Sequence, residues 1–308
     1  MQIAIVGGGA VGCYFGGMLA RAGMSVRLLA RARTVEAIAA KGLRIIRAGI
    51  DDPVALSAST DPSIVRGADV VLLSVKSFDS ASAAREIAPF LDAECLLVSM
   101  QNGVENPSII APLVPCAVLP AVVYVAAEMT AAHEVTHSGR GDLVIGEAAL
   151  GAHRSRVSAP AFAQLAERAG VACRVSDNID GEAWEKLAMN CALNAISALT
   201  RARYGTIHDF APTHAVLDQA VLEVDAVARA AGVRIPVDDL RAAASRLSVA
   251  MSRATSSTAQ DIARSKRTEI DALNGYIARR GAELGVPTPV NSTLHALVRL
   301  LEQGVLAA

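Results

Sequence analysis

A glycine-rich turn near the start of the chain constrains the fold more than any other feature. Residues 7–12 fit the pattern G-x-G-x-x-G, directly after the apolar run Gln2–Val6 and directly before a helical stretch, Cys13–Arg21. In that context the glycines allow a tight turn, close approach of a pyrophosphate, and packing of the helix on the strand. A glycine-rich turn without a ligand is the alternative. We predict a dinucleotide site of Rossmann type, made by Gly7, Gly8, Gly9, Ala10, Val11 and Gly12.

The residues after the second predicted strand indicate which dinucleotide is bound. This strand, Ser25–Ala30, is followed by Arg31-Ala32-Arg33, where an enzyme specific for NAD carries an Asp or Glu for the ribose 2′-hydroxyl. An arginine at this point suits a 2′-phosphate instead. We therefore predict that Arg31 binds this phosphate and that NADPH is preferred over NADH. A solvated charge at the strand end is the alternative.

The pattern of apolar residues divides the chain into two parts. Up to about residue 176, short β-branched runs alternate with helical stretches, which is typical of a parallel sheet covered by helices on both faces. Beyond residue 178 only helical spacing continues. We predict an α/β fold, with a doubly wound Rossmann domain at 1–176 and an all-α domain at 177–308. The predicted strands are Gln2–Val6, Ser25–Ala30, Asp69–Val75, Cys95–Met100, Cys116–Val125 and Ala172–Val175.

Two segments before the last strand predict a late hairpin. His133–Gly139 and Asp142–Glu147 have strand character, and Gly139 and Gly141 are available for a turn between them. The overlapping stretch Tyr124–His137 is distinctive but matches no motif that we can interpret.

Length and composition limit the partners of this chain. Its 308 residues are enough for two domains, and a formal net charge of -1 provides no electrostatic footprint for nucleic acid or an anionic membrane. We find no apolar run of about eighteen residues and no export signal. The 5 cysteines are widely spaced among apolar neighbours, so we expect reduced core residues and no metal. We expect a cytoplasmic protein with a small-molecule partner, and a homodimer on base rates alone.

A polar stripe on an apolar helix is the first candidate for chemistry. Lys186, Asn190 and Asn194 recur at every fourth position and so share one helix face. The rest of the segment is apolar, and a buried lysine or amide needs a polar partner. Either the stripe faces a substrate cleft, or it belongs to an internal hydrogen-bond network.

A second polar cluster follows at residues 256–271. Asp261 and Glu269 lie close to one helix face by spacing, and Ser256 and Ser257 precede a helical run. Serines in that place are often N-caps, and Glu269 considered alone would be a solvated charge.

Taken in chain order, these features resemble the ketopantoate reductase (2-dehydropantoate 2-reductase) family over nearly the whole chain. The resemblance implies a helical C-terminal domain like that of 6-phosphogluconate dehydrogenase. It also implies NADPH-dependent reduction of 2-dehydropantoate to (R)-pantoate, in pantothenate and coenzyme A biosynthesis. The matching residues are Gly7–Gly12, Arg31, Lys76, Gln101-Asn102-Gly103, Lys186, Asn190, Asn194, Ser257, Asp261 and Glu269.

The same resemblance implies a role for each matching residue. Lys186 corresponds to the catalytic proton donor and Glu269 to the late carboxylate of the catalytic cleft. Lys76 corresponds to an NADP contact, and Asn102 to an asparagine that meets both cofactor and substrate. The remaining substrate contacts correspond to Asn190, Asn194 and Ser257. The residue types suit the chemistry, because a positioned ammonium can stabilise charge on a carbonyl oxygen and then donate a proton.

Departures from the family pattern leave the substrate open. Thr258 stands where the family often has Met, and Tyr204-Gly205 stands where better-known members have Asn-Gly. Ala195 replaces a proline next to the second asparagine. The alternatives are a reductase of another 2-keto acid, a non-catalytic NADPH-binding paralogue, and an enzyme like 6-phosphogluconate or 3-hydroxy acid dehydrogenases.

Overall fold

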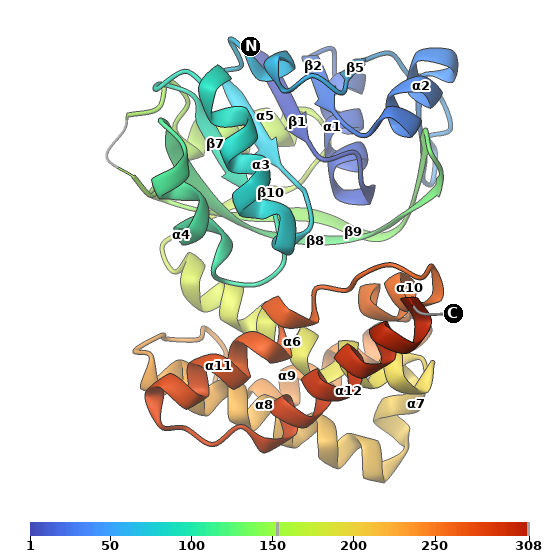
Figure 1. Cartoon of the computed structure of the whole chain (residues 1–308), viewed down its shortest axis with the longest axis vertical. Coiled ribbons are helices and arrows are strands. Elements are labelled where there is room, and N and C mark those ends of the chain that lie inside the picture. Colours follow the sequence, from blue (N-terminus) through green and yellow to red (C-terminus); the bar gives the residue numbers. More distant parts are fainter. Residues whose placement is uncertain (152–153, 307–308) are drawn as a thin grey trace. The chain divides into compact units, whose positions relative to one another are not determined.

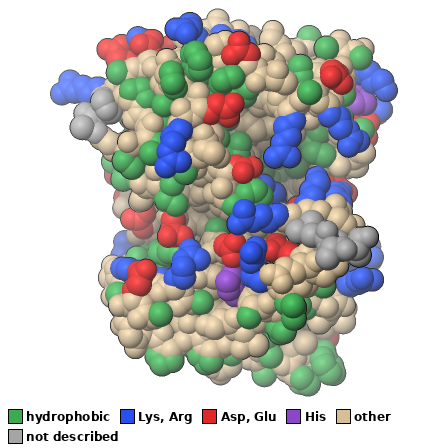
Figure 2. Space-filling view, viewed as in Figure 1, with side chains coloured by type: hydrophobic (Ala, Val, Ile, Leu, Met, Phe, Trp, Pro, Cys, Tyr) green, Lys and Arg blue, Asp and Glu red, His purple; other side chains and the backbone are tan. Residues whose placement is uncertain are grey.

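A computed structural model describes residues 1–151 and 154–306, which form two compact units (Figure 1). Unit 1 comprises Met1–Gln101 and Glu105–Ile179, and unit 2 comprises Asn102–Val104 together with the chain from Asp180 onward. The division after Ile179 lies close to residue 176, where the sequence predicted it. On the face that Figure 2 shows, side chains of both charges are interspersed, in keeping with a net charge of -1.

The main sheet of unit 1 is parallel and doubly wound, as predicted. Its strand order is β5-β2-β1-β6-β7-β8, and every neighbouring pair in this series is parallel. The chain runs outward from β1 on one side and returns to β6 on the other, so the strand order reverses at β1. The strands are β1 (Gln2–Val6), β2 (Ser25–Leu29), β5 (Ser57–Ser59), β6 (Val70–Leu73), β7 (Leu96–Ser99) and β8 (Ala117–Ala131).

Helices cover both faces of this sheet because successive side chains of a strand point to opposite sides. Ile3 and Ile5 of β1 share a core with α1 and α5, whereas Ala4 and Val6 share another core with α3 and α4. The five helices are α1 (Ala10–Arg21), α2 (Ala32–Lys41), α3 (Ser80–Ile87), α4 (Asn106–Ile110) and α5 (Ala159–Arg168). Short 3₁₀ helices are η1 (Pro62–Val65), η2 (Ser77–Asp79), η3 (Ala88–Phe90) and η4 (Ala111–Leu113).

The late hairpin differs from its prediction. The segments around Gly139 and Gly141 form one continuous strand, β9 (Glu134–Gly146), which runs antiparallel to β8. The turn therefore lies before Glu134, and the predicted turn at Gly139 and Gly141 is wrong. The distinctive stretch Tyr124–His137 is the tip of this hairpin. The short strands β3 (Leu43–Ile46) and β10 (Cys173–Ser176) pair parallel with β9, and β4 (Pro53–Val54) pairs antiparallel with β3.

Close packing explains these glycines better than a turn does. A Cβ on Gly141 would run into the hydroxyl of Tyr14, and one on Gly139 would lie 2.9 Å from the Cβ of Ala126. Tyr14 is buried in α1, where its ring stacks on His137 with centroids 4.5 Å apart.

Unit 2 is helical throughout its described residues, as predicted. Its central helix α6 is apolar on nearly all sides, which explains why Leu187, Cys191 and Ala195 are buried. The helices are α6 (Ile179–Thr200), α7 (Tyr204–Asp209), α8 (Ala211–Ala230), α9 (Leu240–Ala250), α10 (Ser257–Ala263), η5 (Ile270–Ala272), α11 (Asn274–Leu284) and α12 (Pro289–Leu306). None of the helices within residues 1–151 and 154–306 is long and apolar enough to cross a membrane. All 5 cysteines are buried and free.

The contact of Gly141 with Tyr14 generates a stability prediction. Gly141→Ala should destabilise the protein by about 1–3 kcal/mol, because the added methyl group overpacks a buried contact. Thermal denaturation followed by circular dichroism measures the effect. Gly304→Ala is the matched control, since a Cβ there meets nothing within 4 Å. A neutral Gly141→Ala would contradict the close-packing explanation.

Candidate active site

The glycine turn follows β1 at the carboxyl edge of the parallel sheet. Gly7 has a φ of +116, and a Cβ on it would lie 2.9 Å from the backbone carbon of Ser74. A Cβ on Gly12 would run into the carbonyl oxygen of Gly7. These two positions therefore require glycine for the turn itself and for its packing against the end of β6.

The other two glycines differ: Gly8 is closely packed, whereas Gly9 leaves room beside the turn. A Cβ on Gly8 would lie 2.7 Å from that of Ala30 at the end of β2, whereas one on Gly9 would meet nothing within 4 Å. Gly9 is the N-cap of α1 without a side-chain cap, and the first turn of α1 has no acidic residue. The positive end of the helix dipole therefore faces this open space, and the cradle fits a pyrophosphate.

Arg31 and Lys76 flank this turn. The side chain of Arg31 is 94% exposed at the start of α2, and its Nη2 lies 3.8 Å from Oδ2 of Asp79. Such an exposed pair is weak, so a phosphate can replace the carboxylate. Lys76 is half-buried at the start of η2, in the segment after β6 that packs against Gly7. Both cations thus follow strands that end at the same edge as β1.

Unit 2 brings together three residues that are far apart in the sequence. Nζ of Lys186, on α6, donates to Oδ1 of Asn102 at 2.8 Å, and Nδ2 of Asn102 donates to Oε2 of Glu269 at 3.3 Å. Glu269 is buried directly before η5, and Lys186 is half-buried. The amide of Asn102 is thus held in one orientation between an ammonium and a carboxylate. We call these residues the Lys-Asn-Glu set.

A buried carboxylate that the sequence did not single out supports Glu269. Oε1 of Glu302 accepts from the backbone N of Thr268 at 2.6 Å, and Oε2 accepts from Nη1 of Arg299 at 2.8 Å. The backbone N of Ile270 donates to Oγ1 of Thr268 at 3.2 Å. The residues on both sides of Glu269 are therefore restrained, although Glu302 comes from the far end of α12. Helical spacing alone offered no signal for this contact.

The polar stripe on α6 is divided between two environments. Lys186 joins the Lys-Asn-Glu set, whereas Asn194 is buried and its Oδ1 accepts from the hydroxyl of Tyr204 at 3.3 Å. The backbone oxygen of Asn194 accepts from Oγ of Ser256 at 3.1 Å. Asn190 lies between them on the helix and is half-buried. Asn194 thus takes part in an internal hydrogen-bond network. Tyr204 in this network is neutral because burial raises the pKa of its hydroxyl.

The two serines before α10 have different environments. Oγ of Ser256 accepts from the backbone N of Ala259 at 3.0 Å, so this serine is the N-cap of α10. Ser257 is exposed, whereas Thr258 and Asp261 are buried behind it. Ser257 is therefore exposed to solvent, whereas Ser256 caps the helix.

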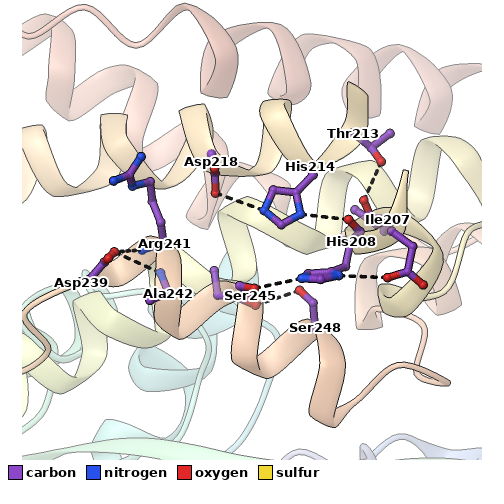
Figure 3. Close-up of polar contacts among 12 residues, drawn as sticks. Ile207, His208, Thr213, His214, Asp218, Asp239, Arg241, Ala242, Ser245 and Ser248 are labelled. Carbon is purple, nitrogen blue, oxygen red and sulfur yellow. Dashed lines mark hydrogen bonds and ion pairs between the residues drawn. The ribbon is translucent and has the colours of Figure 1, made fainter. Parts of the chain in front are cut away.

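A further polar cluster, shown in Figure 3, joins α7, α8 and α9. Nε2 of His208 lies 2.9 Å from Oγ of Ser245, and Nδ1 of His214 lies 2.9 Å from the carbonyl oxygen of His208. Nδ1 of His208 lies 3.1 Å from Oδ1 of Asp209, which is 82% exposed. These bonds tie three helices together, and none of the residues predicted for a site is among them.

Comparison with known proteins identifies similar sequences over nearly the whole length. Residues 3–149 match the family model described as ketopantoate reductase PanE/ApbA, and residues 178–302 match the model of its C-terminal part. The 2-dehydropantoate 2-reductase of Halobacterium salinarum is 32% identical, over 98% of this chain and 99% of its own. That of Mesorhizobium japonicum is 31% identical, over 98% of each. A solved PanE/ApbA family ketopantoate reductase from Ralstonia eutropha is 49% identical, covers 99% of each chain, and has a TM-score of 0.93.

The support of Glu269 by Glu302 generates a second stability prediction. Glu302→Ala should lower the free energy of unfolding of unit 2 by about 1–3 kcal/mol, because it leaves the buried backbone N–H of Thr268 without its acceptor. Fluorescence of Trp184, the single tryptophan, reports on unit 2 during urea unfolding. Glu283→Ala is the matched control, since Glu283 also pairs with the arginine three residues before it but is 61% exposed. An equal effect of the two substitutions would contradict this account.

Proposed function

We propose, because the chain belongs to the ketopantoate reductase family, that it reduces 2-dehydropantoate to (R)-pantoate with NADPH. The observation that carries the proposal is the Lys-Asn-Glu set, in which an ammonium, an amide and a carboxylate are joined by hydrogen bonds. The product would enter pantothenate and coenzyme A biosynthesis. We further propose that the enzyme works in the cytoplasm, as a homodimer on base rates.

Lys186 is the proton donor in this proposal. Bound NADPH supplies a hydride to the carbonyl carbon of the substrate. Negative charge then grows on the carbonyl oxygen, and the ammonium of Lys186 stabilises that charge before it donates a proton to the oxygen. A hydrogen bond to Asn102 holds the ammonium in place. One positioned side chain can therefore provide both the electrostatic stabilisation and the proton.

Asn102 and Glu269 hold the ammonium of Lys186 in position. The carboxylate of Glu269 is buried and lies on the opposite end of the Asn102 amide. Glu269 fixes the amide of Asn102, whose oxygen accepts from Lys186, so Glu269 helps to orient the ammonium. Asn102 also follows β7 by three residues in the chain, which supports the proposal that it contacts cofactor as well as substrate.

Polar uncharged side chains provide the substrate contacts. Asn190 lies one helical turn beyond Lys186 on the same face of α6, and Ser257 is exposed at the start of α10. Amide and hydroxyl groups can bind a carboxylate and a hydroxyl without adding a competing charge. Asn194 is a further proposed substrate contact, and its Oδ1 accepts from the hydroxyl of Tyr204.

The contact between Tyr204 and Asn194 favours a second candidate function. Tyr204 is buried, and its hydroxyl donates a hydrogen bond to Oδ1 of Asn194. Thr258, a second departure from the family pattern, is also buried. A tyrosine brings an apolar ring where an asparagine would bring an amide, so a less polar 2-keto acid is the alternative substrate. A non-catalytic role is disfavoured, because a binding protein has no need of the Lys-Asn-Glu set.

The first prediction from the proposed function concerns the identity of the substrate. The purified protein should oxidise NADPH with ketopantoate faster than with a panel of other 2-keto acids, as measured by the loss of NADPH absorbance. Faster turnover of a less polar 2-keto acid would favour the second candidate. Turnover of no 2-keto acid would overturn the enzymatic proposal.

The second prediction tests the proton donor. Lys186→Ala should lower kcat by about 10²–10⁴-fold, because general acid catalysis contributes about that much. Lys41→Ala, at an exposed lysine on α2, should leave kcat unchanged. Thermal denaturation of each variant separates catalysis from folding. A Lys186→Ala variant that is folded and fully active would remove Lys186 from the mechanism.

The third prediction tests the cofactor preference. Arg31→Ala should raise the Kd for NADPH by about ten- to a hundredfold, since it removes a charge-assisted hydrogen bond to the 2′-phosphate. The Kd for NADH should stay the same. Arg21→Ala, at another exposed arginine with an aspartate partner, serves as the control in fluorescence titrations. Equal losses of NADPH and NADH affinity would argue against a 2′-phosphate contact.

A further inference from the structure

A carboxylate already contacts the arginine that we assign to the 2′-phosphate of the cofactor. Oδ2 of Asp79 lies 3.8 Å from Nη2 of Arg31. The side chain of Arg31 is 94% exposed and that of Asp79 is 41% exposed, so a ligand can reach both from solvent. Any anion that binds Arg31 must therefore approach this carboxylate or take its place.

The side chain of Asp79 does not cap the helix that it precedes. Aspartate is a common N-cap, yet Asp79 makes no capping hydrogen bond to α3. Its backbone makes the local contacts instead, because its N donates to the oxygen of Lys76 at 2.8 Å and its oxygen accepts from Oγ of Ser82 at 2.9 Å. The carboxylate can thus be altered without loss of these bonds.

The Arg31–Asp79 pair connects the segments on either side of the glycine turn. Arg31 follows β2, Asp79 ends η2 in the segment after β6, and β1 lies between these two strands in the sheet. All three strands are parallel and end at the same edge, where the turn after β1 fits a pyrophosphate. A dinucleotide that extends from this turn to Arg31 would therefore bring its 2′-phosphate close to Asp79.

Asp79 opposes that phosphate whether or not Arg31 moves. If Arg31 keeps its place, a phosphate oxygen in a hydrogen bond with Nη2 lies within about 7 Å of Oδ2 of Asp79, and two anions at that separation repel each other. If Arg31 turns toward the phosphate, its attraction to Asp79 is lost. NADH has a hydroxyl in place of the phosphate, so neither cost applies to NADH.

We propose that Asp79 is a specificity-determining residue, whose carboxylate weakens binding of the 2′-phosphate and so limits the preference for NADPH over NADH. This inference rests on the proposed function, which assigns that phosphate to Arg31. Arg31 and Asp79 then act in opposite directions on one group of the cofactor. Together they determine how far the enzyme discriminates between the two nucleotides.

The experiment measures the binding of both nucleotides to the wild type and to Asp79→Asn. This substitution removes the charge and keeps the shape of the side chain. In fluorescence titrations the Kd for NADPH should fall by about three- to tenfold, which is the size expected for repulsion between exposed charges. The Kd for NADH should stay within about twofold of the wild type. Asp79→Glu, which retains the charge, should bind NADPH no more tightly than the wild type.

Ionic strength provides a readout that a structural role of Asp79 would not change. The gain in NADPH affinity of Asp79→Asn should shrink to less than about twofold at about 1 M salt, where the Debye length is about 3 Å. Should Asp79→Asn fail to fold, Asp79→Ser replaces it, because serine is favoured before a helix and carries no charge.

Asp52→Asn is the matched control. Asp52 forms a similar exposed pair, with its Oδ2 3.5 Å from Nη1 of Arg21, but Arg21 ends α1 whereas the glycine turn precedes this helix. This variant should bind both nucleotides like the wild type.

Three results for Asp79→Asn would overturn the inference. They are unchanged binding of NADPH, weaker binding of NADPH, which would mean that Asp79 orients Arg31 for the phosphate, and equal tightening of both nucleotides. The proposed function fails separately. It would stand if Arg31→Ala weakened NADPH alone while Asp79→Asn had no effect. A wild type that binds neither nucleotide would instead refute the proposed cofactor, and with it the proposed function.

Discussion

Burial of the parallel strands on both faces is the constraint on which unit 1 depends. Alternate residues of β1 enter two separate cores, so no side chain in the middle of these strands is free to bind a ligand. Groups that bind a ligand are therefore expected where strands end, and all parallel strands end at one edge. The glycine turn after β1, Arg31 after β2 and Lys76 after β6 share this edge for that reason.

A comparable constraint acts on unit 2, where the central helix α6 is buried on most sides. A lysine on such a helix is stable only beside polar groups, and Lys186 donates to Asn102, which in turn donates to Glu269. Glu269 in turn depends on Glu302, which anchors the backbone of Thr268. The same need explains Asn194, which is paired with Tyr204. One face of α6 therefore carries both Lys186, which we propose for catalysis, and Asn194, which helps to pack the helix.

Local patterns indicated the residues of the proposed site but not the hydrogen bonds that connect them. The glycine turn, the arginine after β2 and the helical stripe each depend on residues within a few positions of one another, so spacing was sufficient. The hairpin of β8 and β9 was predicted with its turn in the wrong place, because Gly139 and Gly141 are typical turn residues. Glycine is required at these positions because a side chain would collide with Ala126 or Tyr14. Spacing along the chain does not reveal contacts with such distant residues. Glu302 left no local signal either.

The sequence by itself determined the elements and the residue types that carry chemistry. Periodicity predicted parallel strands followed by helices, and the absence of a carboxylate at residues 30–33 predicted the form of the cofactor. Only the tertiary structure decided that Asn102 joins Lys186 to Glu269, and that Asn194, at the C-terminal end of the stripe, accepts a hydrogen bond from Tyr204 instead. The physical reason is that hydrogen bonds between distant segments depend on how elements pack. Spacing along one element specifies which residues share a face but not what that face meets.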